Sequence, residues 1–494
     1  METVVVKTRA GKVMGVQEGL LQIFKGIPFA RPPVGPLRFR APQPVEPWSG
    51  VRPAIEFGAS SVQDTTSSQL SGSTAEDCLY LNVWTPRADT ALRPVMVYIH
   101  GGSFMYGSGS QFDGSFFATR GEVVTVTCNY RLGALGFLYL GELLGEDYIT
   151  SGNNALLDII AALQWVHENI ASFGGDPSQV TIMGESAGAM CVATLLAMPA
   201  AQGLFARAIL ESGAGQTTRD VQSAARTTQR FLEAVSIPPD KADALLALPV
   251  EVLLAAQSRM IAGASLRRDF GPVVDSCALP EFPLDAISHG RAAHVPLLIG
   301  TNRDESRLFI AMDRRLASPD ETMLKGIFGT NTQALLNAFR TESQHKVPRQ
   351  AWAEVLTNYQ YRIPAIRVAE EQALQGADVW MYRFDWAKTR WGAFHALELS
   401  FTWPTCDSIN ALVQTALLAP LTATDQLLAE CMQAAWIAFM RTGNPNVPVL
   451  PSWPQYTKTE RATMLFDDAC QVVYIPPIQE EPGFQAKGFS WEES

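Results

Sequence analysis

Short apolar runs rich in β-branched residues recur along this chain, and each ends in a turn or a polar cluster. The runs that we interpret as strands are 95–99, 123–126, 180–183, 295–299 and 379–384. Between them, apolar residues recur at three- and four-residue steps from Leu156 to Ile170, which predicts a helix with one buried face. Strands that alternate with helices predict an α/β fold with a mostly parallel central sheet covered by helices on both faces.

No internal repeat, low-complexity tract or clear linker interrupts this pattern. The proline-rich segment 30–47 and the polar segment 63–76 are predicted to be long surface loops. A chain of 494 residues is longer than most single domains, but large α/β folds reach this size around one sheet. We therefore expect residues 1–494 to form a single domain with long loop insertions.

Composition and charge exclude several classes of protein. Apolar residues make up 47% of the chain and charged residues 18%, which supports a large core and argues against disorder. The net charge is −11 and no basic cluster is present, so we expect no nucleic-acid partner. No apolar run is long enough to span a membrane, and the first seven residues lack the layout of a signal peptide.

The seven cysteines are scattered, odd in number and without C-x-x-C spacing. This pattern is typical of buried thiols in a reducing compartment and argues against a disulfide framework or a zinc site. We expect a cytoplasmic protein without a metal. No pattern in the sequence indicates an oligomeric state.

The pentapeptide Gly184-Glu185-Ser186-Ala187-Gly188 lies between the strand at 180–183 and a run of small residues. In this context the pattern G-x-S-x-G predicts a nucleophile elbow, a sharp turn that exposes a serine. Its two glycines let neighbouring chain segments pass close to the turn. The helix that follows is expected to stop at Pro199. Ser186 is the candidate nucleophile.

A serine nucleophile needs a base, and the base needs an acid that orients it. On such a fold the partners follow in the order Ser, acid, His, which excludes the histidines at 100, 167, 289 and 294. His345 lies in a polar stretch without a preceding strand, whereas His395 lies in a loop after the strand at 379–384. His395 is therefore the candidate base. The adjacent Asp304 and Glu305 follow the strand at 295–299, and the pattern does not choose between them as the acid.

Stabilising an oxyanion requires backbone N–H groups that are already in place. The segment His100-Gly101-Gly102-Ser103-Phe104 follows the strand at 95–99, and its glycines allow the backbone to approach a substrate oxygen. Ala187, directly after the nucleophile, is expected to supply another N–H donor.

Several blocks of the chain resemble the type-B carboxylesterase/lipase family. Phe173-Gly174-Gly175-Asp176-Pro177, followed by Val180-Thr181 and the elbow, is similar to its serine-site signature. Glu76-Asp77-Cys78-Leu79-Tyr80-Leu81-Asn82 is similar to its second signature. Further similar blocks at 26–30, 129–133 and 453–454 extend the resemblance over almost the whole chain. In size and in the absence of a secretion signal, the chain resembles the bacterial para-nitrobenzyl esterases most.

The resemblance implies an α/β-hydrolase fold that works without a metal or an organic cofactor. It implies that Ser186 is the nucleophile, His395 the base and Glu305 the acid, since the family acid is the second residue of the Asp-Glu pair. It implies three oxyanion donors, the backbone N–H groups of Gly102, Ser103 and Ala187, with Gly101 in a supporting position. Ser212 matches a second serine that supports the triad by hydrogen bonding in relatives.

The chain departs from the family pattern at three positions. Ser103 stands where relatives usually have Gly or Ala, but the expected donor is a backbone N–H, so the hole should survive. Ser306 replaces a glycine that is common after the acid, which affects the detail of that turn. Cys78 has no upstream cysteine with which to form the bridge of secreted relatives, in agreement with a cytoplasmic location.

We expect a hydrolase that cleaves small-molecule carboxylic esters through an acyl-enzyme, with uncharged short- to medium-chain or aromatic substrates. Two alternatives are amide or thioester cleavage on the same triad and a non-catalytic binding protein on the same fold. Apolar neighbours of the candidate residues in sequence are possible pocket residues, although core packing is the commoner role of such side chains. They are Phe104, Leu308, Phe309, Phe401 and Trp403.

Overall fold

The computed structural model describes residues 2–65, 72–261 and 269–475. Its strands are β1 (Thr3–Lys7), β2 (Lys12–Glu18), β3 (Leu21–Pro28), β4 (Val51–Pro53), β5 (Ser60–Ser61), β6 (Thr74–Ala75), β7 (Tyr80–Thr85), β8 (Arg93–Ile99), β9 (Val124–Cys128), β10 (Gly175–Glu185), β11 (Arg207–Glu211), β12 (Arg219–Asp220), β13 (Val273–Val274), β14 (Leu297–Asn302), β15 (Val379–Phe384), β16 (Ala462–Phe466) and β17 (Gln471–Tyr474).

Its α-helices are α1 (Ser115–Gly121), α2 (Gly133–Phe137), α3 (Gly141–Leu144), α4 (Asn154–Asn169), α5 (Ala187–Leu195), α6 (Val221–Ala234), α7 (Val250–Ile261), α8 (Pro283–Ser288), α9 (Ser306–Met312), α10 (Glu321–Phe328), α11 (Thr332–Glu342), α12 (Pro348–Thr357), α13 (Ile363–Leu374), α14 (Leu399–Thr402), α15 (Asp407–Ala416) and α16 (Ala423–Thr442). A π-helical turn, Asn358–Arg362, joins α12 to α13.

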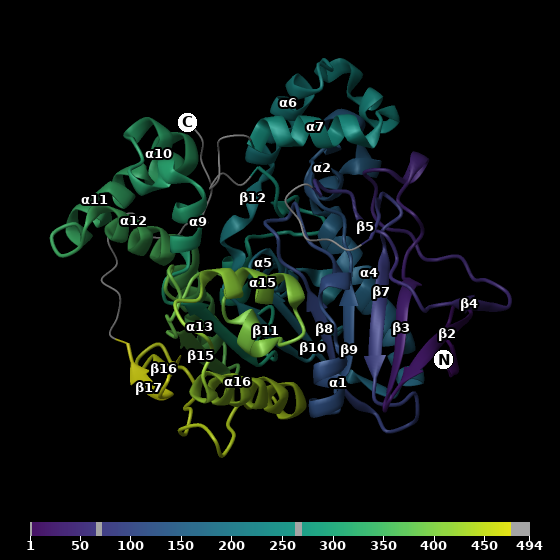
Figure 1. Ribbon diagram of the computed structural model, residues 1–494. Coiled ribbons are helices and arrows are strands. Elements are labelled where there is room, and N and C mark those ends of the chain that lie inside the picture. The colour runs from purple at the N-terminus through teal and green to yellow at the C-terminus, as the bar shows by residue number, and fades with distance from the viewer. Residues whose placement is uncertain (1, 66–71, 262–268, 476–494) are drawn as a thin grey trace.

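One large sheet of 13 strands runs through the molecule in the order β1-β2-β3-β7-β9-β8-β10-β11-β14-β15-β16-β17, with β4 paired to β2. All pairs from β9 to β16 along this order are parallel. The pairs among β1, β2, β3, β7 and β9, and the pair β16–β17, are antiparallel. Figure 1 places the purple N-terminal strands and the yellow C-terminal strands at opposite edges of the sheet. The predicted parallel centre is confirmed.

Alternating side chains of the parallel strands enter two separate cores. In β8, Val95 and Val97 belong to the same hydrophobic cluster as residues of α4 and α5. Met96 and Tyr98 point to the other face, into a cluster with the aromatic residues of α16. This alternation arises because successive side chains of a strand point to opposite faces, so a sheet covered by helices on both faces has no polar side.

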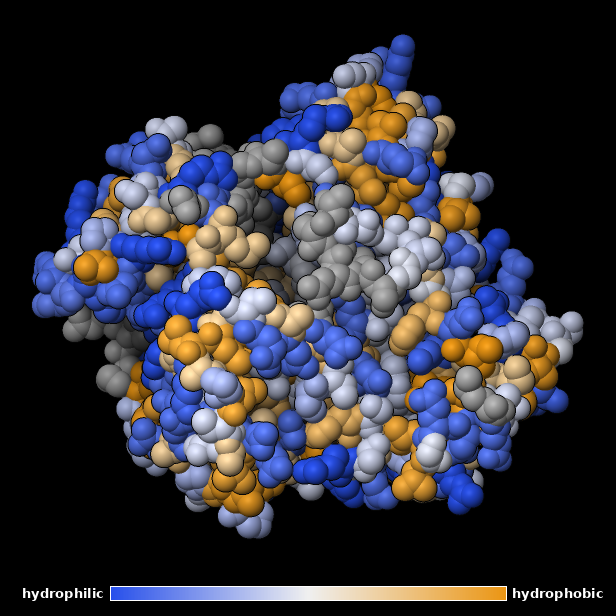
Figure 2. Space-filling model, viewed as in Figure 1, coloured by the Kyte–Doolittle hydropathy of each residue, from blue (hydrophilic) through white to orange (hydrophobic). Residues whose placement is uncertain are grey.

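Helices α9 to α12 enclose a third hydrophobic cluster of their own, which includes Leu324, Leu335 and Trp352. In Figure 1 helices α10 to α12 stand to one side of the sheet, and α6 and α7 lie together above it. Figure 2 shows the surface hollowed between these two groups of helices, with apolar and charged residues interspersed around the hollow. The chain thus inserts a helical lobe between β14 and β15, the strands that precede Glu305 and His395.

The sequence-based expectations for local structure agree with these elements. The five predicted strands correspond to β8, β9, β10, β14 and β15, and the predicted helices to α4 and α5. Helix α5 ends at Leu195, before Pro199, as expected. The proline-rich segment 30–47 contains one short 3₁₀ turn. Of the polar segment 63–76, residues 66–71 lie outside the described residues, and the short strand β6 follows.

A buried ion pair ties the loop after β9 to helix α4. Both carboxylate oxygens of Asp158 accept hydrogen bonds from the Arg131 guanidinium, at 2.7 and 2.8 Å. The same guanidinium donates to the carbonyl of Arg40 at 2.7 Å, so it also holds the proline-rich segment. Both side chains are almost fully buried. A charge in such a place is tolerated only while its partner is present.

We predict that Asp158→Ala lowers the free energy of unfolding by about 3–5 kcal/mol, because it leaves the Arg131 guanidinium buried and unpaired. Urea unfolding followed by tryptophan fluorescence measures this change. Asp147→Ala is the matched control, since Asp147 forms an exposed pair with Arg40 at 3.0 Å. The control should cost less than about 1 kcal/mol. Equal losses in the two variants would contradict the prediction.

Candidate active site

The predicted elbow is a tight turn between β10 and α5. Ser186 has φ 55° and ψ −123°, a conformation that is costly for a residue with a side chain, and its N–H donates to the carbonyl of Glu211 at 2.9 Å. A Cβ on Gly184 would lie 2.5 Å from the carbonyl carbon of Gly188, and one on Gly188 would lie 2.0 Å from the carbonyl oxygen of Ile99. Both glycines are therefore required by close backbone approach.

The three residues expected to form a triad are joined by hydrogen bonds. Nε2 of His395 lies 2.8 Å from Oγ of Ser186, and Nδ1 of His395 lies 2.7 Å from Oε2 of Glu305. The second oxygen of Glu305 accepts from the backbone N–H of Asn302 at 2.8 Å. All three side chains are buried, and Glu305 is completely inaccessible. The structure thus brings together residues that are 90 and 209 positions apart in the chain.

Two aromatic rings lie beside the imidazole of His395, both tilted to its plane. The rings of Phe309 and Tyr361 have centroids 5.2 and 4.8 Å from that of His395. The two flanking rings are parallel to each other, with an angle of 2° between their planes. Phe309 comes from α9, and Tyr361 from the π-helical turn before α13. The helical lobe therefore contributes to the surroundings of the imidazole.

The glycine-rich loop after β8 lies directly beside the nucleophile. A Cβ on Gly101 would be 2.7 Å from the carbonyl of Glu185 and 3.2 Å from Cβ of Ser186. Gly102 and Ser103 both have positive φ, 110° and 56°. In the part of the chain that the structure describes, no hydrogen bond uses the N–H of Gly102, Ser103 or Ala187. Ala187 is the first residue of α5, where the N–H has no partner in the helix.

The model of the carboxylesterase family matches residues 2–475. The chain belongs to this family.

Similar proteins span nearly the same length. The chain is 40% identical to a para-nitrobenzyl esterase of Bacillus subtilis over 98% of this chain and 99% of that protein. It is 33% identical to a phenmedipham hydrolase of Pseudarthrobacter oxydans, over 94% and 95%. It also resembles the crystal structure of a Geobacillus stearothermophilus carboxylesterase, with a TM-score of 0.86, 40% identity and coverage of 96% and 98%. The protein is a carboxylic-ester hydrolase with the α/β-hydrolase fold.

Three further buried carboxyl groups lie near the triad of this carboxylesterase. Oε1 of Glu185 is 3.3 Å from Nε2 of His395. Burial raises the pKa of Glu185 well above its ordinary value, and the charges of Glu398, Glu305 and Glu211 raise it further. Burial, followed by the charge of Glu305, raises the pKa of Glu398 to about 8. The site therefore holds several carboxyl groups that resist ionisation together.

Ser212 reaches the triad only indirectly. Its Oγ donates to Oε1 of Glu398 at 2.9 Å, and the other oxygen of Glu398 accepts from the side-chain amide of Asn302. The same amide donates to the carbonyl of Phe394 at 2.7 Å. Ser212 thus belongs to a buried polar network behind the imidazole, and its direct partner is Glu398. The spacing of Glu398, three residues after His395, is a signal that sequence reasoning missed.

Among the residues expected to line the substrate pocket, Phe309 contacts the imidazole of His395. Phe104, Leu308, Phe401 and Trp403 are buried within the hydrophobic cores. Phe401 packs against aromatic rings at the end of β15 and in the following loop, and Trp403 packs against three rings at centroid distances of 4.7 to 5.5 Å. These contacts correspond to core packing, the role that such aromatic residues more often have. Tyr361 was not expected, because it is remote in sequence from every motif.

The carboxylesterase has no helix, among residues 2–65, 72–261 and 269–475, that is long and apolar enough to cross a membrane. Within the same ranges, no group of three or more His, Cys, Asp or Glu side chains could hold a metal ion. The seven cysteines are all free thiols.

His100, the first residue after β8, is buried. Its Nδ1 lies 2.8 Å from the carbonyl oxygen of Gly101, and its ring stacks on Tyr130 with centroids 4.3 Å apart. The Tyr130 hydroxyl donates to the carbonyl of His100 at 2.7 Å. Burial lowers the pKa of His100 to about 4, against a partial opposing effect of the bond to Gly101. These contacts fix the start of the loop that faces Ser186.

The lowered pKa of His100 predicts a loss of stability in acid. Between about pH 6.5, the ordinary histidine value, and about pH 4, the unfolded chain binds a proton at His100 that the folded chain does not. Protonation of His100 therefore does not lower the free energy of unfolding above about pH 6.5, and lowers it increasingly as the pH falls below that value. The decrease in the free energy of unfolding should amount to about 2 kcal/mol between pH 7.5 and pH 5.

The test compares urea unfolding of wild type and His100→Gln at pH 7.5, 6 and 5. We expect the variant to be the less stable protein at pH 7.5, because it loses the stacking on Tyr130. The difference in the free energy of unfolding between the two proteins should become smaller towards pH 5, because only the wild type has a buried histidine that resists protonation. Parallel stability curves for the two proteins would contradict the lowered pKa.

Proposed function

We propose that Ser186, His395 and Glu305 carry out ester hydrolysis through an acyl-enzyme. The observation that supports this most strongly is the continuous chain of short contacts from Glu305 through His395 to Ser186, at 2.7 and 2.8 Å, in a buried site. A serine hydroxyl is a weak nucleophile, and this arrangement supplies the base and the orienting acid that it needs.

In the first half-reaction, Oγ of Ser186 attacks the ester carbonyl while Nε2 of His395 takes its proton. The carboxylate of Glu305 keeps the remaining ring proton on Nδ1 and stabilises the positive imidazolium. The tetrahedral intermediate then collapses. The carbon–oxygen bond to the alcohol breaks, His395 returns the proton to the leaving oxygen, and the acyl group stays on Ser186.

In the second half-reaction, His395 removes a proton from water, which attacks the acyl carbonyl. Collapse of the second tetrahedral intermediate releases the carboxylic acid and returns the proton to Ser186. In both half-reactions the N–H groups of Gly102, Ser103 and Ala187 hold the oxyanion, with Gly101 allowing the loop to approach. Their freedom from other hydrogen bonds supports this role, because such donors need no rearrangement when the charge develops.

We propose uncharged short- to medium-chain or aromatic esters as substrates. The para-nitrobenzyl esterase that resembles this chain carries the name of an aromatic ester substrate. The ring of Phe309, which lies beside the imidazole of His395 and is only partly buried, supports an apolar substrate group at this place. The burial that raises the pKa of Glu185, beside His395, also disfavours a charged substrate group at the same place.

We also propose that the enzyme works in the cytoplasm, on small molecules and without a nucleic-acid partner. The seven free thiols support a reducing compartment, since four of them, at 78, 128, 191 and 406, are buried and unbridged.

The test is hydrolysis of a para-nitrophenyl ester series with acyl chains of 2 to about 16 carbons, measured with wild type and Ser186→Ala. We expect turnover that is highest on short to medium acyl chains and a loss of kcat of roughly 10⁴-fold or more in the variant. Ser178→Ala is a matched control, because Ser178 lies on the same strand β10 but at its exposed end.

Turnover that survives in Ser186→Ala would refute the acyl-enzyme mechanism. A folded wild type that cleaves a matched anilide or thioester faster than the ester would refute the proposed substrate class. Circular dichroism of both variants confirms that any loss belongs to the chemistry.

A further inference from the structure

The Asp-Glu pair after β14 divides into two different tasks. Glu305 faces the imidazole, whereas the carboxylate of Asp304 faces the loop that carries His395. Oδ2 of Asp304 accepts a hydrogen bond from the backbone N–H of Ala393 at 3.0 Å. In return, the N–H of Asp304 donates to the carbonyl of Ala393 at 2.9 Å. Asp304 therefore holds both polar backbone groups of a residue two positions before His395.

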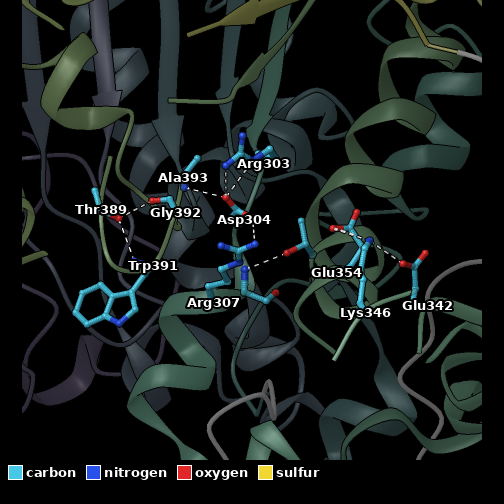
Figure 3. Close-up of polar contacts among 12 residues, drawn as sticks. Arg303, Asp304, Arg307, Glu342, Lys346, Glu354, Thr389, Trp391, Gly392 and Ala393 are labelled. Atoms are coloured by element: carbon cyan, nitrogen blue, oxygen red, sulfur yellow. Dashed lines mark hydrogen bonds and ion pairs between the residues drawn. The ribbon is translucent and has the colours of Figure 1, made fainter. Parts of the chain in front are cut away.

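Two arginines hold the Asp304 carboxylate in place. Arg307 lies 2.9 Å from Oδ1 and Arg303 lies 3.1 Å from Oδ2. Figure 3 shows Asp304 between these two side chains and the Gly392–Ala393 backbone. The carboxylate is buried although the arginines are partly exposed. A buried carboxylate with this many donors has one allowed position, and it transmits that position to the loop.

The histidine loop approaches the Asp304 carboxylate most closely at Gly392. Gly392 has φ +69°, and a Cβ at this position would lie 2.3 Å from Oδ2 of Asp304. The turn is closed on its other side by Thr389, whose Oγ1 donates to the carbonyl of Gly392 at 2.6 Å. The loop therefore reaches Asp304 only with glycine at position 392.

Arg303 also connects this contact to the helical lobe. Its carbonyl accepts from the guanidinium of Arg362 at 3.0 Å, and Arg362 pairs with Glu354 of α12 at 3.0 Å. Lys346 extends the chain of charges from Glu354 to Glu342. Figure 3 shows Glu354, Lys346 and Glu342 in sequence away from Asp304. The acid turn is thus tied to the lobe on one side and to the histidine loop on the other.

We propose that Asp304 is a positioning residue for His395 in the ester hydrolysis proposed above. The inference rests on the assigned roles of Ser186, Glu305 and His395. Asp304 contacts neither the substrate nor the reacting atoms. Through its hydrogen bonds with Ala393 it fixes the position of the histidine loop relative to β14. Nδ1 of His395 then stays on Glu305 while Nε2 faces Ser186. A displacement of about 1 Å in such an alignment is enough to lower a rate by roughly 100-fold.

The decisive experiment compares Asp304→Ala and Asp304→Asn with wild type on para-nitrophenyl acetate. Alanine removes the acceptor for the Ala393 N–H, and we expect kcat to fall roughly 10- to 100-fold with KM changed by less than about 3-fold. Asparagine keeps one acceptor oxygen in the same place. It should therefore restore a large part of kcat.

The pH profile gives a readout that a general loss of stability would not change. The carboxyl groups facing the His395 ring are Glu305 and Glu185. If the loop moves away from Glu305 in Asp304→Ala, the Glu305 carboxylate stabilises the imidazolium of His395 less. The acidic limb of the kcat/KM profile then moves to lower pH by about half a unit or more. In Asp304→Asn the limb should stay nearer that of the wild type.

Asp385→Ala is the matched control. Asp385 is a similarly buried carboxylate that directly follows β15 and binds Arg383 through both oxygens, at 2.6 and 2.7 Å. In the described structure, no hydrogen bond or ion pair joins it to residues 391–395. It should lose thermal stability as Asp304→Ala does while keeping the wild-type kcat and pH profile. A reduced kcat in this control would assign the effect of both variants to general stability and overturn the proposal.

The remaining outcomes separate the two proposals. Wild-type kcat and pH profile in Asp304→Ala would make Asp304 a structural residue only and overturn the inference, while Ser186-dependent turnover would leave the proposed function intact. If wild type itself were inactive, the proposed function would fail first. If Asp304→Ala does not fold, Gly392→Ala tests the same inference, because the added Cβ displaces the Asp304 carboxylate without removing it. Unchanged kcat in a folded Gly392→Ala would then overturn the inference.

Discussion

The active site depends on one steric constraint, the close backbone approach at the turn after β10. Ile99 of the neighbouring strand passes so near to Gly188 that no side chain can stand there, and Gly184 is equally confined by the first turn of α5. The strained Ser186 conformation persists because the parallel strands on either side hold this turn rigidly. Ser186 and the N–H of Ala187 lie in this turn, and the loop that begins at His100 passes beside it.

Three loops complete the site, each following a parallel strand. Because the strands β8, β10 and β14 run in the same direction, the loop of Gly101 and Gly102, the turn of Ser186 and the turn of Glu305 meet at the carboxyl-terminal end of these strands. The histidine loop follows β15, and its backbone is held through the acid turn, by Asp304 at Ala393 and by Asn302 at Phe394. Base and acid are therefore aligned through neighbouring backbone contacts as well as through their own hydrogen bond.

Burial gives this site its electrostatic character. Glu185, Glu211, Glu305 and Glu398 are all buried near one another, and desolvation together with mutual repulsion raises the pKa of Glu185, Glu211 and Glu398. Glu305 is the direct hydrogen-bond partner of Nδ1 of His395, whereas Glu398 accepts hydrogen bonds from Ser212 and Asn302. The rings of Phe309 and Tyr361 pack beside the imidazole of His395, with centroids 5.2 and 4.8 Å away.

Much of this protein is readable from local pattern, because hydrophobic periodicity and turn chemistry act over a few residues. The parallel core strands, α4, α5, the elbow at Ser186 and the loop of His395 follow from such patterns, and the family resemblance selects Glu305 over Asp304. What the pattern could not supply depends on distances between segments remote in the chain. The antiparallel strands at the sheet edges, the burial of Phe401 and Trp403 in the core, the arrival of Tyr361 beside the imidazole and the grip of Asp304 on Ala393 arise only when the chain packs, since each is a contact between residues that no local rule relates.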